Sequence, residues 1–150
     1  VGLNNKIWNP QINYFNNTVV TYDILGHGKT SLNKEKISFD DFSEQLLNLI
    51  DEIKFEKIHL VGFSIGSLIA RNFATKYNSR LSSLTLLCST FKRDEKQKQI
   101  VNDRFELSKK NKTLSKQLLK DGLLKNIWIK IIILIKKFVT CLIIIIWKTF

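Results

Sequence analysis

The sequence predicts an α/β fold in which helices flank a parallel β-sheet. Three observations support this prediction. Through residues 1–90, short β-branched runs alternate with helical periods, as they do in βαβ units. The run at 57–63 is almost continuously apolar, which fits a strand buried on both faces. A Gly-x-Ser-x-Gly motif at 62–66 joins this strand to the helix expected after it.

The first expected elements follow one another in a regular order. Residues 18–23 form a predicted strand, and residues 25–28 form the turn that ends it. Ser38 and Asp41 have the spacing of a capping box and predict the start of a helix. Apolar residues then recur at helical spacing, so one stripe of this helix should face the sheet: Phe42, Leu46, Leu49, Ile50 and Ile53.

A second helix is expected after the apolar strand, from about residue 65 to residue 77. Its inward-facing residues should be Leu68, Ile69, Phe73 and Ala74. Residues 84–88 form the third predicted strand. From 91 to 128 the pattern becomes helical and strongly basic, and an apolar, Lys-containing tail of unknown role follows at 129–150. We therefore divide the chain into a core at 1–90, the helical segment and this tail.

Positive charge is concentrated in the C-terminal part of the chain. The 150 residues carry a net charge of +11, yet residues 1–90 hold nine Lys and Arg against eight Asp and Glu. Such asymmetry is typical of proteins that contact nucleic acid or membranes. Because no Arg cluster or interleaved aromatic stripe is present, we expect no nucleic-acid partner. The abundance of Lys, Ile and Asn also fits an A/T-rich codon bias.

The C-terminal tail is too interrupted by charge for a simple membrane span. In residues 127–150, 18 of 24 residues are apolar, but the longest uncharged run is the ten residues 138–147. A spanning helix needs about 20 such residues. Isoleucine blocks of this density also form strands that aggregate. Contact of the tail with a membrane surface therefore stays an alternative.

The remaining composition indicates a cytoplasmic protein without a metal site. The two cysteines, Cys88 and Cys141, are too few for a disulfide framework or a structural zinc site. Neither has a neighbouring cation that would favour a thiolate, so we expect both to be inert. The N-terminal residues lack the pattern of a signal peptide.

The Gly62–Gly66 motif fits a nucleophile elbow. In such an elbow a serine sits on a sharp, strained turn between strand and helix, and small neighbours let the two approach closely. Ser64 would then expose its hydroxyl, and the backbone N–H of Ile65 would face a developing oxyanion at the helix N-terminus. The alternative is a Gly- and Ser-rich turn that only packs tightly.

At these residues the chain resembles the α/β-hydrolase family, and within it the small esterases and lactonases typified by 3-oxoadipate enol-lactonase. The resemblance runs from Val1 to about Trp128. It rests on three motifs in the family's order and spacing: Gly2 with Trp8-Asn9-Pro10-Gln11, the stretch YDILGHGKTS at 22–31, and HLVGFSIG at 59–66.

The resemblance implies specific roles for residues of a partial α/β-hydrolase. Ser64 matches the nucleophile, the Ile65 N–H the first oxyanion donor, and Val1 a truncated second donor. Gly62 and Gly66 match the elbow glycines. The implied substrate is a small carboxylic ester or lactone, cleaved through an acyl-enzyme without a cofactor, and residues 91–128 would begin a helical cap. Asp23 and the Gly26-His27-Gly28 turn match positions that shape a loop.

The implied triad is incomplete in this sequence. The family order is serine, then acid, then histidine, and no His follows Ser64. His27 should serve its turn, and His59 is too close along its strand to reach Ser64. Asp94 and Glu95 are expected to start a surface helix. We therefore expect an inactive fragment, with a basic membrane-associated protein using residues 91–150 as the alternative.

The resemblance also predicts a gap in the sheet. In the family, the strand that would precede Val1 lies between the strands at 18–23 and 58–63. Its absence should leave unpaired backbone groups on both neighbours. We expect these two strands to pair with each other or the chain to aggregate.

Overall fold

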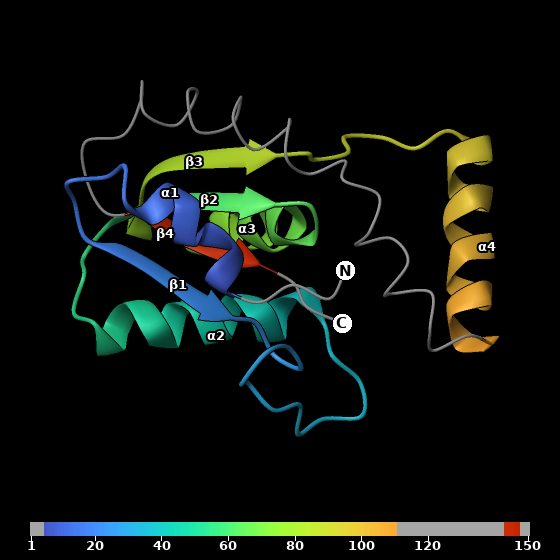
Figure 1. The fold of residues 1–150 in the computed structure, drawn as a ribbon, viewed down its shortest axis with the longest axis horizontal. Coiled ribbons are helices and arrows are strands. Elements are labelled where there is room, and N and C mark those ends of the chain that lie inside the picture. The colour runs from blue at the N-terminus through green and yellow to red at the C-terminus, as the bar shows by residue number, and fades with distance from the viewer. Residues whose placement is uncertain (1–4, 111–142, 148–150) are drawn as a thin grey trace.

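A four-stranded parallel sheet with helices on both faces forms the centre of the molecule (Figure 1). The computed structural model describes residues 5–110 and 143–147. The strand order is β1-β4-β2-β3, and every pair of neighbours is parallel. The strands are β1 (Val19–Asp23), β2 (Ile58–Phe63), β3 (Leu81–Leu87) and β4 (Ile143–Trp147).

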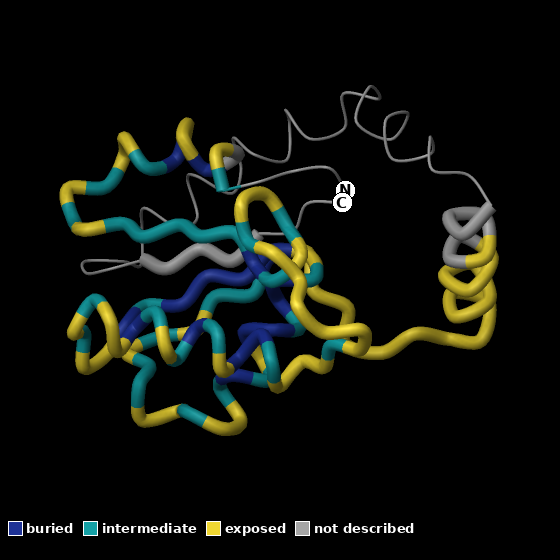
Figure 2. The backbone as a smooth tube through the Cα atoms, turned by 90° about the horizontal axis from the view of Figure 1, so that it is seen from below, coloured by how far each residue is buried: buried dark blue, intermediate teal, exposed yellow. Residues whose placement is uncertain are grey.

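The helices form two layers around this sheet. The short elements η1 and α1 lie on one face, α3 lies on the other, and α2 packs beside α3 (Figures 1 and 2). Helix α4 stands apart from the sheet in both views. The bounds are η1 (Asn5–Trp8), α1 (Asn9–Ile12), α2 (Phe39–Glu52), α3 (Ile65–Lys76), η2 (Asn78–Arg80) and α4 (Glu95–Lys110).

The hydrophobic core lies between the sheet and the α2–α3 layer. Phe42, Leu46 and Ile50 of the predicted stripe are buried, and Leu49 and Ile53 at its edges are half-buried. They pack with residues of β2 and α3 that are fully buried: Ile58, Leu60, Ile69, Ala70 and Phe73. The predicted α/β fold with a parallel sheet is therefore confirmed. In α3, Ile69 and Phe73 are buried as predicted, Leu68 and Ala74 are only half-buried, and Ala70, which was not predicted to face inward, is fully buried.

Two helix starts have the local chemistry that their sequences indicate. The Ser38 hydroxyl accepts from the Asp41 N–H (3.3 Å), and the Ser38 N–H donates to the Asp41 carboxylate (2.8 Å). This capping box begins α2, as predicted. Before α4, the Asp94 carboxylate accepts from the Gln97 N–H (2.7 Å). Asp94 thus caps an exposed helix, as expected for a surface helix start.

The third strand differs from its prediction. It begins at Leu81, earlier than the predicted residue 84, and ends at Leu87. Because β3 is the last strand in the sheet order, Ser82 and Leu84 are exposed, and apolar continuity alone does not mark its start. Cys88 follows the strand in an exposed position with φ +52°, so the expectation that the strand runs to residue 88 was wrong.

The N-terminal elements pack on the sheet through Trp8. Trp8 is fully buried, and η1, which it ends, contacts β1 and β4. Trp8 therefore holds the first helical segment on the sheet.

The expected gap in the sheet was also wrong. The strand Ile143–Trp147 lies between β1 and β2 and pairs with both of them. Its sequence, IIIIW, is uninterrupted by charge and suits a central parallel strand. Residues 143–147 of the tail therefore have a place in the sheet. Most of the predicted cap and tail, residues 111–142, lies outside the described residues.

No helix in the described part of the chain combines the length and apolar character that crossing a bilayer requires.

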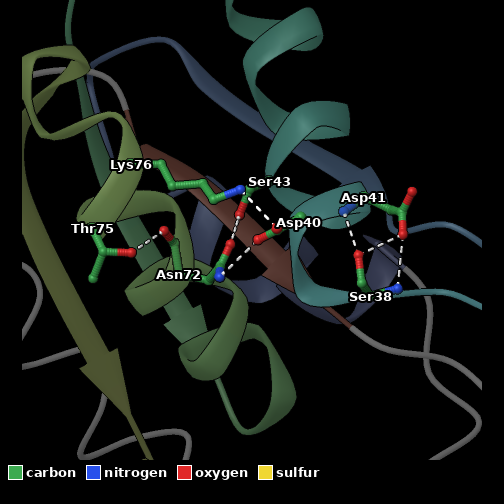
Figure 3. A network of polar contacts seen from close by, with 7 residues as sticks. All are labelled: Ser38, Asp40, Asp41, Ser43, Asn72, Thr75 and Lys76. Atoms are coloured by element: carbon green, nitrogen blue, oxygen red, sulfur yellow. Dashed lines mark hydrogen bonds and ion pairs between the residues drawn. The ribbon is translucent and has the colours of Figure 1, made fainter.

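A polar network joins α2 to α3 at their exposed surface (Figure 3). The buried Ser43 hydroxyl donates to the Asn72 side-chain oxygen (2.6 Å), and the Asn72 amide donates to Asp40 (3.1 Å). The Lys76 ammonium pairs with the other Asp40 oxygen (2.8 Å). These contacts fix the two helices that carry the core, one of which begins at the Ser64 turn.

Acid should weaken this network. The bonds from Lys76 and Asn72 hold the pKa of Asp40 below its usual range. The resulting stability is present above the unfolded-state pKa of about 3.9 and is lost as the pH falls through the lower folded value. In urea titrations, the loss of stability between about pH 5 and pH 2 should be smaller for Asp40→Asn than for the wild type. The exposed Glu52→Gln on the same helix is the control; equal pH dependence of all three proteins would contradict the role of Asp40.

Candidate active site

Ser64 occupies a sharp turn between β2 and α3. Its backbone has φ +54° and ψ −116°, whereas β2 ends at Phe63 and α3 begins at Ile65. The residue is exposed, and its side chain makes no capping hydrogen bond to the helix. A non-glycine residue with this φ is strained and persists only where the surrounding structure enforces it. The strand–turn–helix setting expected for the motif is thus present.

The strain at Ser64 follows from the close approach of β2 to the start of α3. A Cβ at Gly62 would lie 2.4 Å from the carbonyl oxygen of Gly66 and 2.8 Å from the Cα of Ser67. Only glycine lets the strand pass the helix at this distance. The chain must then reverse within one residue, and that residue is Ser64.

Hydrogen bonds hold the turn on both sides. The Ser64 N–H donates to the carbonyl of Leu87 on β3 (3.0 Å). The Ser64 carbonyl accepts from the Ser67 N–H (3.0 Å) and from the Ser67 hydroxyl (2.5 Å). Ser67 is fully buried. Its side chain therefore stabilises the backbone of the turn and leaves Ser64 as the exposed hydroxyl.

The N-terminus of α3 gives this turn a favourable environment for negative charge. The first N–H groups of a helix lack helical partners, and the helix dipole adds partial positive charge there. The first turn of α3 contains no acidic residue that would cancel this field. An oxyanion beside Ser64 would meet the Ile65 N–H.

A second ordered turn follows β1 at the same edge of the sheet, because the carboxyl ends of parallel strands meet there (Figure 1). The Asp23 carboxylate accepts from the Lys29 N–H (3.0 Å) and from the Asn5 N–H (2.8 Å). A Cβ at Gly28, which has φ +54°, would lie 2.1 Å from an Asp23 carboxylate oxygen. Asp23 therefore shapes the turn, as expected, and also ties it to η1.

Gln45 of α2 supports the same turn from the core side. Its amide NH₂ donates to the Asp23 carbonyl (3.1 Å), and its side-chain oxygen accepts from the Leu25 N–H (3.0 Å). Neither Gln45 nor the Asp23–Asn5 bond was predicted, because a single polar residue on a helix carries no spacing signal.

The hydrogen bonds of the two histidines serve other parts of the structure than the Ser64 elbow. The His27 Nδ1–H donates to the Leu25 carbonyl (2.7 Å), so His27 bonds within its own turn, as expected. His59 is half-buried near the start of β2, where its Nδ1 bonds to the Ser83 hydroxyl (2.6 Å). At about 3.3 Å per residue, the strand carries Ser64 roughly 16 Å away from His59.

The Tyr22 phenol is too buried to act as a base. On β1, burial raises the pKa of the Tyr22 phenol far above its usual range, so it stays neutral. Within residues 5–110 and 143–147, no group of three His, Cys, Asp or Glu side chains is arranged to hold a metal ion. Val1 and Cys141 lie outside the described residues.

Residues 3–125 match the family described as alpha/beta hydrolase fold. The chain belongs to this family. The match covers the sheet from β1 to β3, the elbow and α4, and it ends before β4.

Two curated relatives that match this chain differ in the activity that their names give. The dihydrolipoyllysine-residue acetyltransferase component of the acetoin cleaving system from Pseudomonas putida is 32% identical over 87 residues, 58% of this chain and 24% of that protein. The 3-oxoadipate enol-lactonase 1 of Acinetobacter baylyi is 31% identical over 94 residues, 61% of this chain and 35% of that protein. The predicted likeness to such lactonases is confirmed. The chain matches only about a quarter to a third of these relatives' lengths.

A solved structure shares the fold. MGS-M2, an alpha/beta hydrolase enzyme from a Medee basin deep-sea metagenome library, superposes with a TM-score of 0.66 at 20% identity. The alignment covers 89% of this chain and 52% of that one.

The strain at position 64 is open to a direct test. Glycine adopts positive φ without steric cost, whereas alanine keeps the Cβ that conflicts there. We expect Ser64→Gly to be more stable than Ser64→Ala by about 1 kcal/mol in urea unfolding, although glycine ordinarily destabilises. At the exposed Ser82 of β3, the same pair of substitutions should show the opposite order. A more stable Ser64→Ala would contradict the strained turn.

Proposed function

We propose that this chain carries the nucleophilic half of a serine hydrolase site that acts on a small carboxylic ester or lactone. The observation that carries the proposal is Ser64, exposed at φ +54° on the turn that opens α3. A residue with a strained backbone, an exposed side chain and no capping bond fits a nucleophile better than a packing role. A turn that only packs would gain nothing from this strain.

The relatives support chemistry at an acyl carbon. One is named for acetyl transfer and another for opening an enol lactone. These names describe different reactions of a carbonyl group. They are consistent with a shared acyl-serine step.

In the proposed reaction, Ser64 Oγ attacks the carbonyl carbon, and the electron pair of the C=O bond moves to oxygen. The Ile65 N–H binds this oxyanion at the α3 N-terminus, and we assign Val1 as the second donor. Collapse breaks the bond to the leaving oxygen, which takes up the serine proton through a general base. Water then attacks the acyl-serine, releases the carboxylic acid and restores Ser64.

Neither histidine of the chain is a candidate for the general base of this reaction. His59 is held by Ser83, His27 bonds within its turn, and no His follows Ser64 in the sequence. We therefore expect the chain alone to acylate slowly. The proposal has three further parts. Residues 91–128 begin a cap over the site, the protein is cytoplasmic, and the reaction needs no cofactor.

A fluorophosphonate probe tests the proposal, because a nucleophilic serine beside oxyanion-binding N–H groups displaces its fluoride and becomes phosphonylated. We expect slow labelling of the full chain, measured by intact mass over hours, with the adduct on Ser64. Ser64→Ala should abolish this labelling, and the exposed control Ser89→Ala should retain it.

Two outcomes would contradict this account. Equal labelling of Ser64→Ala and the wild type would remove Ser64 as the nucleophile. Rapid labelling that is lost in His27→Ala or His59→Ala would show that the chain holds a base after all.

A further inference from the structure

Strands β1 and β2 are held together through β4. Thr21 of β1 and Val61 of β2 are both Cα partners of Ile145, one on each side of β4. The paired stretches run from Val19 to Asp23 on β1 and from His59 to Gly62 on β2. Without β4, each of these strands would present an edge of unpaired N–H and C=O groups toward the other. Removal of β4 would therefore leave a groove between them with the length of one short strand.

The layers above and below restrict what this groove accepts. Helix α3 contacts β4 on one face of the sheet and η1 contacts it on the other (Figure 1). A strand covered on both faces has to be uncharged and apolar, since a charge there would lose its hydration. Ile143–Trp147 meets this requirement, and the charged Lys148 follows immediately after the strand.

The strand that fills this groove, Ile143–Trp147, lies outside the part of the chain that matches the family. The family match ends at residue 125, and residues 111–142 separate α4 from β4. Loop-closure entropy rises only slowly with the number of intervening residues, so a strand of the same chain docks at a high effective concentration.

We propose that the groove between β1 and β2 is a binding site for a separable parallel strand, and that the chain's own Ile143–Trp147 binds it. Docking of this strand joins the Asp23 turn and the Ser64 elbow in one sheet, because Trp147 pairs with Asp23 and Ile146 pairs with Gly62. The inference concerns assembly of the sheet and does not depend on the hydrolase proposal.

Disulfide trapping tests the position of the strand. In the full chain with Cys88→Ser and Cys141→Ser, the pairs Thr21→Cys/Ile145→Cys and Val61→Cys/Ile145→Cys should each form a disulfide within the monomer under mild oxidation. Partners in register lie about 5 Å apart, within the Cα range of a disulfide. The control Thr21→Cys/Ile143→Cys is two residues out of register, roughly 8 Å, and should oxidise at least about tenfold more slowly.

Each alternative result would overturn the proposal. Covalent dimers in place of cross-linked monomers would mean that a second copy donates the strand. Failure of either in-register pair to cross-link would mean that Ile145 does not lie between β1 and β2.

Hydrogen exchange tests whether the strand is separable. Ile145→Pro removes a backbone donor from β4, and amides of β1 should then exchange at least about tenfold faster than in the wild type. Amides of β3, which pairs only with β2 among the described strands, should change by less than about twofold. Unchanged exchange in β1, or equal acceleration in β1 and β3, would overturn a separable strand.

Discussion

The close approach of Gly62 to the backbone of Gly66 and Ser67 determines the geometry of the candidate site. Because the strand passes the helix start at a distance that excludes any Cβ, the connection between them is limited to one residue. That residue, Ser64, accepts a positive φ and remains exposed. Its exposure and its place at the α3 N-terminus both follow from this single packing constraint.

The site also depends on how the sheet is assembled. Ser64 follows β2, whereas the turn shaped by Asp23 follows β1, and β4 lies between these two strands. The carboxyl ends of the strands bring the two turns to one edge only while β4 keeps β1 and β2 in the same sheet. Gln45 and the Ser43–Asn72–Asp40 contacts then hold α2 against the turn and against α3.

Features set by local chemistry could be predicted from the sequence. The capping box at Ser38 and Asp41 and the apolar stripe of α2 need only residues within a few turns of each other. The Gly62–Gly66 motif is equally local, since its glycines and serine lie on one strand–helix junction. These signals identified the fold class and the residue proposed as the nucleophile.

Features set by distant contacts could not be predicted in this way. Val19 pairs with Ile143, and the uniform IIIIW run has no period that separates a strand from a buried helix. The bond from Asn5 to Asp23 joins backbone and side chain across two elements, which leaves no spacing pattern. The early start of β3 was missed because exposed residues interrupt an edge strand.

A crystal structure of the full chain would test the central constraint most directly, through the backbone of residue 64. We predict a positive φ for Ser64, an exposed hydroxyl, and Gly62 packed on the carbonyl of Gly66. A Ser64 that is buried, or that has the negative φ of a regular helix, would contradict it.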